Sequence, residues 1–188
     1  MFWTMRKGLL IITLLCISTG VVSAQGRVER VGVVNSLKEF GISLGVRQGH
    51  DSSLYNTFSL KADMEGIFLG KEMIPGVKFS YTHQNFMKKG SFRGGEALYA
   101  IFFGGGFCGG YVKDSGGEWL GHGPMAGLAA DAGALFLFPC RIDIMLSLSG
   151  EFGLYLRKDQ RYGSTELSWY RNGVVKAWVP NVTIFYRF

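Results

Sequence analysis

Hydrophobic and polar residues alternate along most of this chain with a period of two. The longest example covers residues 142–156, where apolar side chains take the even positions and Asp143, Ser147 and Glu151 take odd positions. Because successive side chains of a β-strand point to opposite faces, this alternation predicts a strand with one apolar face and one polar face.

The same alternation recurs in other segments, which together with the first make seven strong candidate strands. The others cover residues 38–48, 54–69, 77–84, 96–112, 119–138 and 178–188. Turn-forming residues separate the segments, and Asn172-Gly173 is the strongest local hairpin signal. A barrel whose two chain ends lie on the same side needs an even number of strands, so we expect an eighth. Residues 28–34 and residues 164–171 are both candidates for it.

The length of these segments helps to indicate whether water or lipid surrounds them. Strands of soluble proteins have about 5–6 residues, whereas a tilted membrane-spanning strand needs about 9–11. In a soluble sandwich or a lipocalin-like barrel, charged residues should recur on the wet face. Here the polar face mixes charges of both signs with Ser, Thr, Gly and Ala, which suits the crowded interior of a narrow barrel. Aromatic residues near the ends of the apolar faces fit the girdles of a membrane barrel: Phe40, Tyr81, Tyr99, Tyr111, Trp119, Trp178 and Tyr186.

We therefore predict an all-β fold, namely a closed antiparallel up-and-down transmembrane β-barrel of eight strands. A sheet in lipid must close, because an open edge would leave unpaired backbone groups in hydrocarbon.

The first residues have the pattern of an export signal. Arg6 and Lys7 precede an apolar run over residues 9–22, and small residues lead up to Ala24. An uncleaved anchor is the alternative, but a span needs about 20 apolar residues, and Gly20 interrupts this run. We predict a signal peptide over residues 1–24, cleaved after Ala24, and a barrel domain over residues 25–188.

Charge and cysteine content limit the possible partners. The formal net charge is +6, and loss of Arg6 and Lys7 leaves 6 − 2 = +4, because the first 24 residues contain no acidic residue. The charges are mixed in sign and form no Lys/Arg run, so we predict no nucleic-acid binding. Cys108 and Cys140 would remain after cleavage, and in an oxidising compartment they could pair if their Cα atoms lie within about 7 Å.

The export signal, the GGY step at residues 109–111 and the closing stretch VPNVTIFYRF at residues 179–188 carry a family resemblance. The chain resembles the small outer-membrane β-barrel proteins of Gram-negative bacteria, the OmpA/OmpX-type class, most of which have no assigned activity. The resemblance implies residence in the outer membrane, contact with its lipids and recognition by the barrel-assembly machinery. The assembly signal would be the lipid-facing residues of the last strand: Val182, Ile184, Tyr186 and Phe188.

Two further expectations concern that last strand. Phe185 interrupts the alternation, so we expect it to pack inside the barrel against small residues such as the glycines of another strand. We also expect the last strand to pair with the first and close the barrel.

The polar face supplies a candidate lumen charge network. Its members are Glu39, Arg47, Lys61, Asp63, Glu65, Lys78, Asp131, Asp143, Glu151 and Arg157. The network could line a narrow pore, but the interior of an eight-stranded barrel is only wide enough for side chains to fill it. We therefore interpret it as a packed plug in a non-enzymatic barrel that serves envelope structure or presents its loops to a surface ligand.

Catalytic and metal-binding signals are weak. His50 and Ser52 flank Asp51, and some outer-membrane lipid-modifying hydrolases use a histidine, a serine and an acid. The lipid A deacylases, however, carry their motif late in the chain, and Asp and Ser are expected in a turn anyway. No histidine has metal-ligand spacing to a carboxylate or thiolate, so we predict no metal and no cofactor. A lipid-modifying hydrolase, a narrow pore and a component of a conjugation or surface-export apparatus remain the alternative functions.

Overall fold

The computed structural model describes residues 26–36, 39–48, 54–63, 76–92, 97–113, 121–159, 163–170 and 179–188. These residues form one antiparallel sheet. Its strands are β1 (Gly26–Ser36), β2 (Glu39–Gln48), β3 (Leu54–Asp63), β4 (Val77–Ser91), β5 (Leu98–Lys113), β6 (Gly121–Leu137), β7 (Ile142–Asp159), β8 (Thr165–Tyr170) and β9 (Val179–Arg187). Within the same residues, no helix has the length and hydropathy needed to cross a bilayer.

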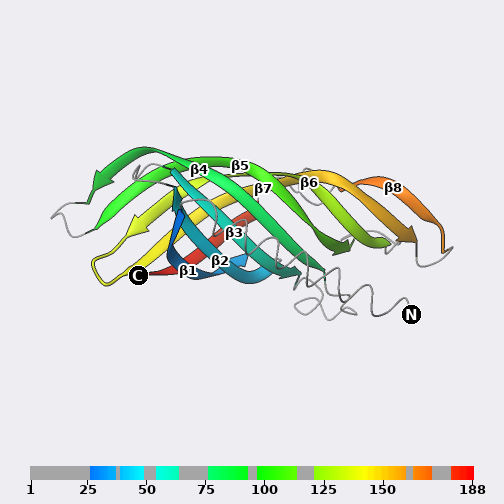
Figure 1. Cartoon of the computed structure of the whole chain (residues 1–188), viewed down its shortest axis with the longest axis horizontal. Helices are drawn as coiled ribbons and strands as arrows, with labels where there is room; N and C mark the ends of the chain where they lie inside the picture. The colour runs from blue at the N-terminus through cyan, green and yellow to red at the C-terminus, as the bar shows by residue number, and fades with distance from the viewer. Residues whose placement is uncertain are drawn as a thin grey trace.

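The sheet closes on itself. Each strand from β1 to β7 pairs with its neighbour in sequence, and β9 pairs with β7 on one side and with β1 on the other. The ring therefore contains eight strands, β1 to β7 and β9, all antiparallel to their neighbours (Figure 1). The predicted closed eight-stranded antiparallel barrel is confirmed, as is the pairing of the last strand with the first.

Both candidates for the eighth strand form strands. Residues 28–34 lie in β1, which completes the ring, and residues 164–171 largely coincide with β8. β8 pairs with residues 153–158 of β7, whereas β9 pairs with residues 142–149 of the same strand. Because both run antiparallel to β7, β8 and β9 follow one another in the same direction along it.

The Asn172-Gly173 dipeptide, with its hairpin signal, lies outside the described residues. The described strands on its two sides, β8 and β9, pair with β7 and not with each other. The signal of the dipeptide is purely local, and the strands on its two sides are held by a common neighbour.

The two ends of the barrel differ. We call the end where β1 begins and β9 ends the terminal end, and the opposite end, where β8 lies, the loop end; Figure 1 shows them at the left and right. The strands β4 to β7 have 15, 16, 17 and 18 residues, whereas β1, β2 and β3 have 11, 10 and 10. One side of the wall is thus taller than the other.

Strand β9 follows the predicted division between its two faces. Val182, Ile184 and Tyr186 are 44%, 53% and 49% exposed, whereas Thr183 and Phe185 are 1% and 2% exposed. Gly32 of β1 lies opposite Phe185, and a Cβ on Gly32 would come within 2.7 Å of the Phe185 ring. The prediction that Phe185 packs inside against a glycine of another strand is confirmed.

The two cysteines do not pair. Cys108 is buried on β5, and Cys140 is exposed in the turn between β6 and β7. Both are free thiols.

Candidate functional site

A cluster of four charges, three of them buried and Glu39 half-buried, crosses the lumen towards the loop end. Lys78 on β4 contacts the carboxylates of Glu39 on β2 and Glu151 on β7. The Nζ of Lys61 on β3 lies 3.7 Å from a carboxylate oxygen of each acid. Glu39, Lys61 and Lys78 come from adjacent strands and Glu151 comes from elsewhere in the ring, so this four-ion cluster ties distant parts of the wall together.

The sheet register explains why the cluster needs all four charges. Lys61 and Lys78 are direct cross-strand partners, and like charges in that position repel. Glu39 and Glu151 each contact both ammonium groups, so two positive and two negative charges balance. Buried charges that are paired in this way avoid the large cost of an uncompensated ion.

An apolar cluster lies against the four-ion cluster and extends from it towards the loop end. It consists of Cys108, Val112, Met125, Ala129, Tyr155 and Tyr170. The Tyr170 hydroxyl accepts a hydrogen bond from Lys78 Nζ at 3.3 Å, which links the two clusters. Tyr170 belongs to β8, so β8 contributes to the lumen although it lies outside the ring.

A layer of hydroxyl and amide groups lies between the four-ion cluster and the terminal end. Asp131 Oδ2 accepts hydrogen bonds from Thr82 Oγ1, at 3.1 Å, and from Gln84 Nε2. Gln84 Oε1 in turn accepts one from Thr57 Oγ1 at 2.9 Å. The cavity among these groups has a volume of about 30 Å³, close to the space of a single water molecule. Side chains therefore nearly fill the lumen at this level.

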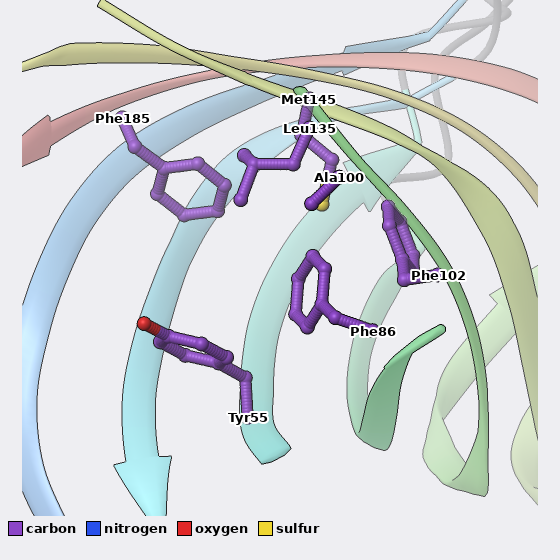
Figure 2. Packing of buried hydrophobic residues seen from close by; sticks show 7 residues of the cluster. All are labelled: Tyr55, Phe86, Ala100, Phe102, Leu135, Met145 and Phe185. Atoms are coloured by element: carbon purple, nitrogen blue, oxygen red, sulfur yellow. The ribbon is translucent and has the colours of Figure 1, made fainter. Parts of the chain in front are cut away.

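An aromatic cluster fills the next level towards the terminal end (Figure 2). Its members are Tyr55, Phe86, Ala100, Phe102, Leu135, Met145 and Phe185. Tyr55 and Phe86 meet edge to face with ring centroids 5.2 Å apart, and the Phe86 and Phe102 centroids are 5.3 Å apart. The lumen is therefore apolar at this level, because apolar residues from several strands meet there.

Ion pairs surround the mouth of the lumen at the terminal end. Arg30 Nε lies 3.0 Å from Asp143 Oδ2, and Arg187 Nη1 lies 3.7 Å from the other oxygen of the same carboxylate. Arg47 Nε lies 3.1 Å from Glu29 Oε1. The Arg30 guanidinium also stacks 4.5 Å above the Tyr55 ring centroid. Asp143 therefore pairs with two arginines, of which Arg30 had not been assigned to the lumen from the sequence.

Sequence reasoning missed Glu29 and Arg30 because of a β-bulge. The pairing of β1 with β2 shifts between Val28 and Arg30, which makes Glu29 an extra residue. A bulge breaks the strict alternation, so both charged residues reach the lumen although they are consecutive in sequence. Two adjacent charged residues inside an apolar run are the only signal that could have indicated it.

The structure brings together only part of the predicted charge network. Glu39, Lys61, Lys78 and Glu151 form one cluster, and Asp131 belongs to the hydroxyl layer. Asp143 and Arg47 both belong to the contacts at the terminal-end mouth, where Arg30 pairs with Asp143 and both Arg30 and Arg47 donate to the Tyr55 hydroxyl. Arg157 is on β7 beside Gly121, near the loop end. The Asp63 side chain, Glu65, the weak catalytic candidates His50 and Ser52, and the predicted signal peptide lie outside the described residues.

The two described histidines are in contacts on the outer face. His83 Nδ1 is hydrogen-bonded to Asn56 Oδ1 at 2.8 Å, and His122 Nδ1 is hydrogen-bonded to the Tyr111 hydroxyl. Across the part of the chain that the structure describes, no three His, Cys, Asp or Glu side chains are grouped to hold a metal ion.

A cavity of about 510 Å³ opens at the terminal end, above the aromatic cluster. Tyr55, Phe86, Ala100 and Leu135 form its floor and belong to both. From the loop end to the terminal end, the lumen thus contains an apolar cluster, the four-ion cluster, a hydroxyl layer, the aromatic cluster and this cavity. Comparisons of the chain with protein-family models, with curated proteins and with solved structures find no match.

Proposed function

We propose that this protein is a small, non-enzymatic β-barrel of the bacterial outer membrane, with a lumen sealed by side chains. The reversed polarity of the wall is the single observation that carries the proposal. On β5, for example, Ile101, Phe103, Phe107 and Tyr111 are exposed on the outer face. The lumen, by contrast, contains ion pairs. Such a distribution suits lipid outside and a packed polar interior.

The height of the apolar band supports a membrane environment. At about 3.3 Å per residue and a tilt of about 40°, the stretch of β5 from Tyr99 to Tyr111 rises by roughly 30 Å. The hydrocarbon core of a bilayer is about 30 Å thick. A band of this height would therefore cover the hydrocarbon core.

Aromatic contacts at both ends of the wall also support it. At the terminal end, Phe92 stacks on Phe136 at a centroid distance of 5.9 Å, and Tyr186 meets Phe188 at 5.5 Å. Towards the loop end, the Tyr111 and His122 ring centroids lie 5.6 Å apart. Aromatic rings gather at membrane–water interfaces, where their apolar bodies and polar edges are both accommodated.

A gel assay combined with detergent partition tests the membrane assignment. A closed barrel folded in detergent migrates differently before and after boiling, and it enters the detergent phase. We expect both behaviours for this protein. Recovery in the aqueous phase, with no difference in migration, would contradict the assignment.

The layers of the lumen support a sealed barrel over a pore. The four-ion cluster and the hydroxyl layer occupy consecutive levels, and the cavity between their side chains measures about 30 Å³. We expect a planar bilayer that contains the folded protein to show no single-channel steps above baseline. Regular conductance steps would instead favour the narrow-pore alternative.

The outward residues of β9 support recognition by the barrel-assembly machinery. Val182, Ile184, Tyr186 and Phe188 all point away from the lumen. Deletion of Phe188 should lower outer-membrane levels far more than it lowers the free energy of unfolding, and Phe188→Tyr, which keeps a terminal aromatic ring, should restore them. Unchanged levels after the deletion would refute this role.

In this view the protein stabilises the envelope or presents its loop end to a surface ligand. The loop end has the two longest connections between consecutive strands of the ring from β1 to β7, residues 64–76 and 114–120, and it contains β8. The proposal requires no cofactor and no catalytic residue.

A further inference from the structure

The terminal-end cavity has two chemically different walls. Strands β9, β1 and β2 are neighbours in the ring, and β4, β5 and β6 lie across the lumen from them. Both sets of strands line the cavity of about 510 Å³. This volume falls within the range of about 300–1,000 Å³ that is usual for small-molecule sites.

The first wall is cationic. It carries the guanidinium groups of Arg187, Arg30 and Arg47, one from each strand. Two carboxylates accompany them, Glu29 on Arg47 and Asp143 between Arg30 and Arg187. Among the described residues of this wall, three guanidinium groups accompany two carboxylates, a net charge of 3 − 2 = +1. The cavity therefore favours an anion.

The opposite wall and the floor are largely apolar. Leu98 and Ala100 of β5 and Leu135 and Leu137 of β6 line it, and the Phe86 ring closes the floor. A small inorganic anion would leave this surface uncovered, whereas a neutral apolar molecule would make no use of the cationic wall. Only a molecule with both an anionic group and an apolar body complements both walls.

We propose that this cavity binds an alkyl carboxylate, that is, a fatty-acid-like chain with one terminal carboxylate. The head group accepts charge-assisted hydrogen bonds from the guanidinium wall, and the alkyl chain packs on the apolar wall and floor. The contacts within the cationic wall favour this head group, because the anions that pair with its arginines are carboxylates, Glu29 and Asp143. A guanidinium group matches the planar geometry of a carboxylate with two parallel donors.

The assignment does not depend on the solvent around the barrel. It rests on the mouth of the lumen, which the structure builds from the ring of strands alone. The protein can therefore be a membrane barrel and still not bind the ligand. The gel assay distinguishes a folded barrel that does not bind from a protein that does not form the barrel.

Octanoate labelled with ¹³C at the carboxylate is a suitable probe, titrated into the folded protein in neutral detergent micelles. Protein-free micelles give the partition background, and NMR reports both the carboxyl carbon and the arginine Nε–H signals. We expect saturable one-to-one binding, with shifts at Arg47 and Arg187 and none at Arg141. Absence of saturable binding to protein that the gel assay shows to be folded would overturn the proposal.

A pair of variants tests the cationic wall. The Arg47 side chain is 37% exposed, so Arg47→Gln should fold; loss of its charge should raise the Kd for octanoate about tenfold. Arg141→Asn is the matched control, since Arg141 is exposed at the same end, does not line the cavity and has φ 63°, which Asn tolerates. Equal affinities of the two variants would contradict head-group recognition by this wall.

Two competitors test the choice of ligand. Octanol shares the chain and lacks the charge, so it should displace octanoate at least tenfold less well than unlabelled octanoate does. Octanol that competes equally would reduce the site to an apolar cavity and overturn the proposal. Octyl phosphate that competes tenfold better than octanoate would identify a phosphate site and would contradict the carboxylate assignment.

Discussion

Leu128 and Lys78 lie on the same sheet and show how differently its two faces are built. Leu128, on the outer face of β6, is 68% exposed, whereas Lys78, on the lumen face of β4, is only 7% exposed. In a water-soluble domain, these two side chains would be expected in the opposite places. The lumen can hold Lys78 because Glu39 and Glu151 compensate its charge.

Each face of the sheet is stabilised by a different means. The lumen depends on complementarity between specific partners across the barrel, so loss of one partner leaves another charge unpaired. The outer face has no such partners at Leu128 and depends on the surrounding solvent. The stability effect of a substitution should therefore depend on charge pairing if the residue faces the lumen. It should depend on depth in the membrane if the residue lies on the outer face.

The largest effect on the free energy of unfolding is expected for a substitution in the lumen. Lys78→Met should lower the free energy of unfolding by about 3–5 kcal/mol, because it leaves Glu39 and the buried Glu151 with Lys61 as their remaining ammonium partner. Urea unfolding in detergent, followed by the gel assay, measures the change. Lys158→Met removes an exposed lysine and should change stability by no more than about 0.5 kcal/mol.

The double variant Lys78→Met/Glu151→Met sharpens this result. It removes one charge of each sign, so Glu39 and Lys61 remain as a pair, and much of the stability should return. A double variant that is less stable than Lys78→Met would show that the four charges do not compensate one another as described.

The next effect is expected on the outer face. In a bilayer, Leu128→Arg should cost about 2–4 kcal/mol, because it places a charge near the middle of the apolar band. Leu167 on β8 has nearly the same exposure, 67% against 68%, but lies at the loop end. Leu167→Arg should cost only about 0–1 kcal/mol there. Unfolding in lipid vesicles measures both, and equal costs would argue against a depth gradient.

The smallest of the three effects concerns glycines. A Cβ on Gly32 would overlap the backbone oxygen of Ile184 and come within 2.7 Å of the Phe185 ring, where β1 meets β9. Gly32→Ala should therefore cost about 1–3 kcal/mol. Gly150 has nothing within 4 Å of its Cβ position, so Gly150→Ala should stay within about 0.5 kcal/mol. Similar losses of unfolding free energy for the two variants would show that the close contact of Gly32 with β9 does not limit stability.

Much of this fold could be predicted from the sequence, because period-two alternation reports directly which residues share a face. The strand ring, its closure by β9 and the inward position of Phe185 all follow from that pattern and are confirmed. The arrangement of β8 and β9 could not be predicted in this way. Their common pairing with β7 is a long-range contact, and a local signal such as Asn172-Gly173 carries no information about it.

The candidate site was less predictable for two physical reasons. The bulge after Val28 shifts the alternation within β1, so Glu29 and Arg30 could not be assigned to the lumen from period alone. The aromatic cluster, in turn, arises from residues such as Phe102 and Leu135, each of which looks like an isolated exception on its own strand. Only the three-dimensional register of the strands places these exceptions at one level.

We propose that lipid surrounds the outer face. This proposal is tested most directly by spin labels at outward positions of β6, namely residues 126, 128, 130, 132 and 134, in a Cys108→Ser/Cys140→Ser background reconstituted in lipid vesicles. We predict that these labels collide with dissolved oxygen and are shielded from a water-soluble nickel chelate, most strongly near the middle of the band, whereas a label at residue 167 collides with nickel. Nickel accessibility that is equally high along β6 would contradict the claim.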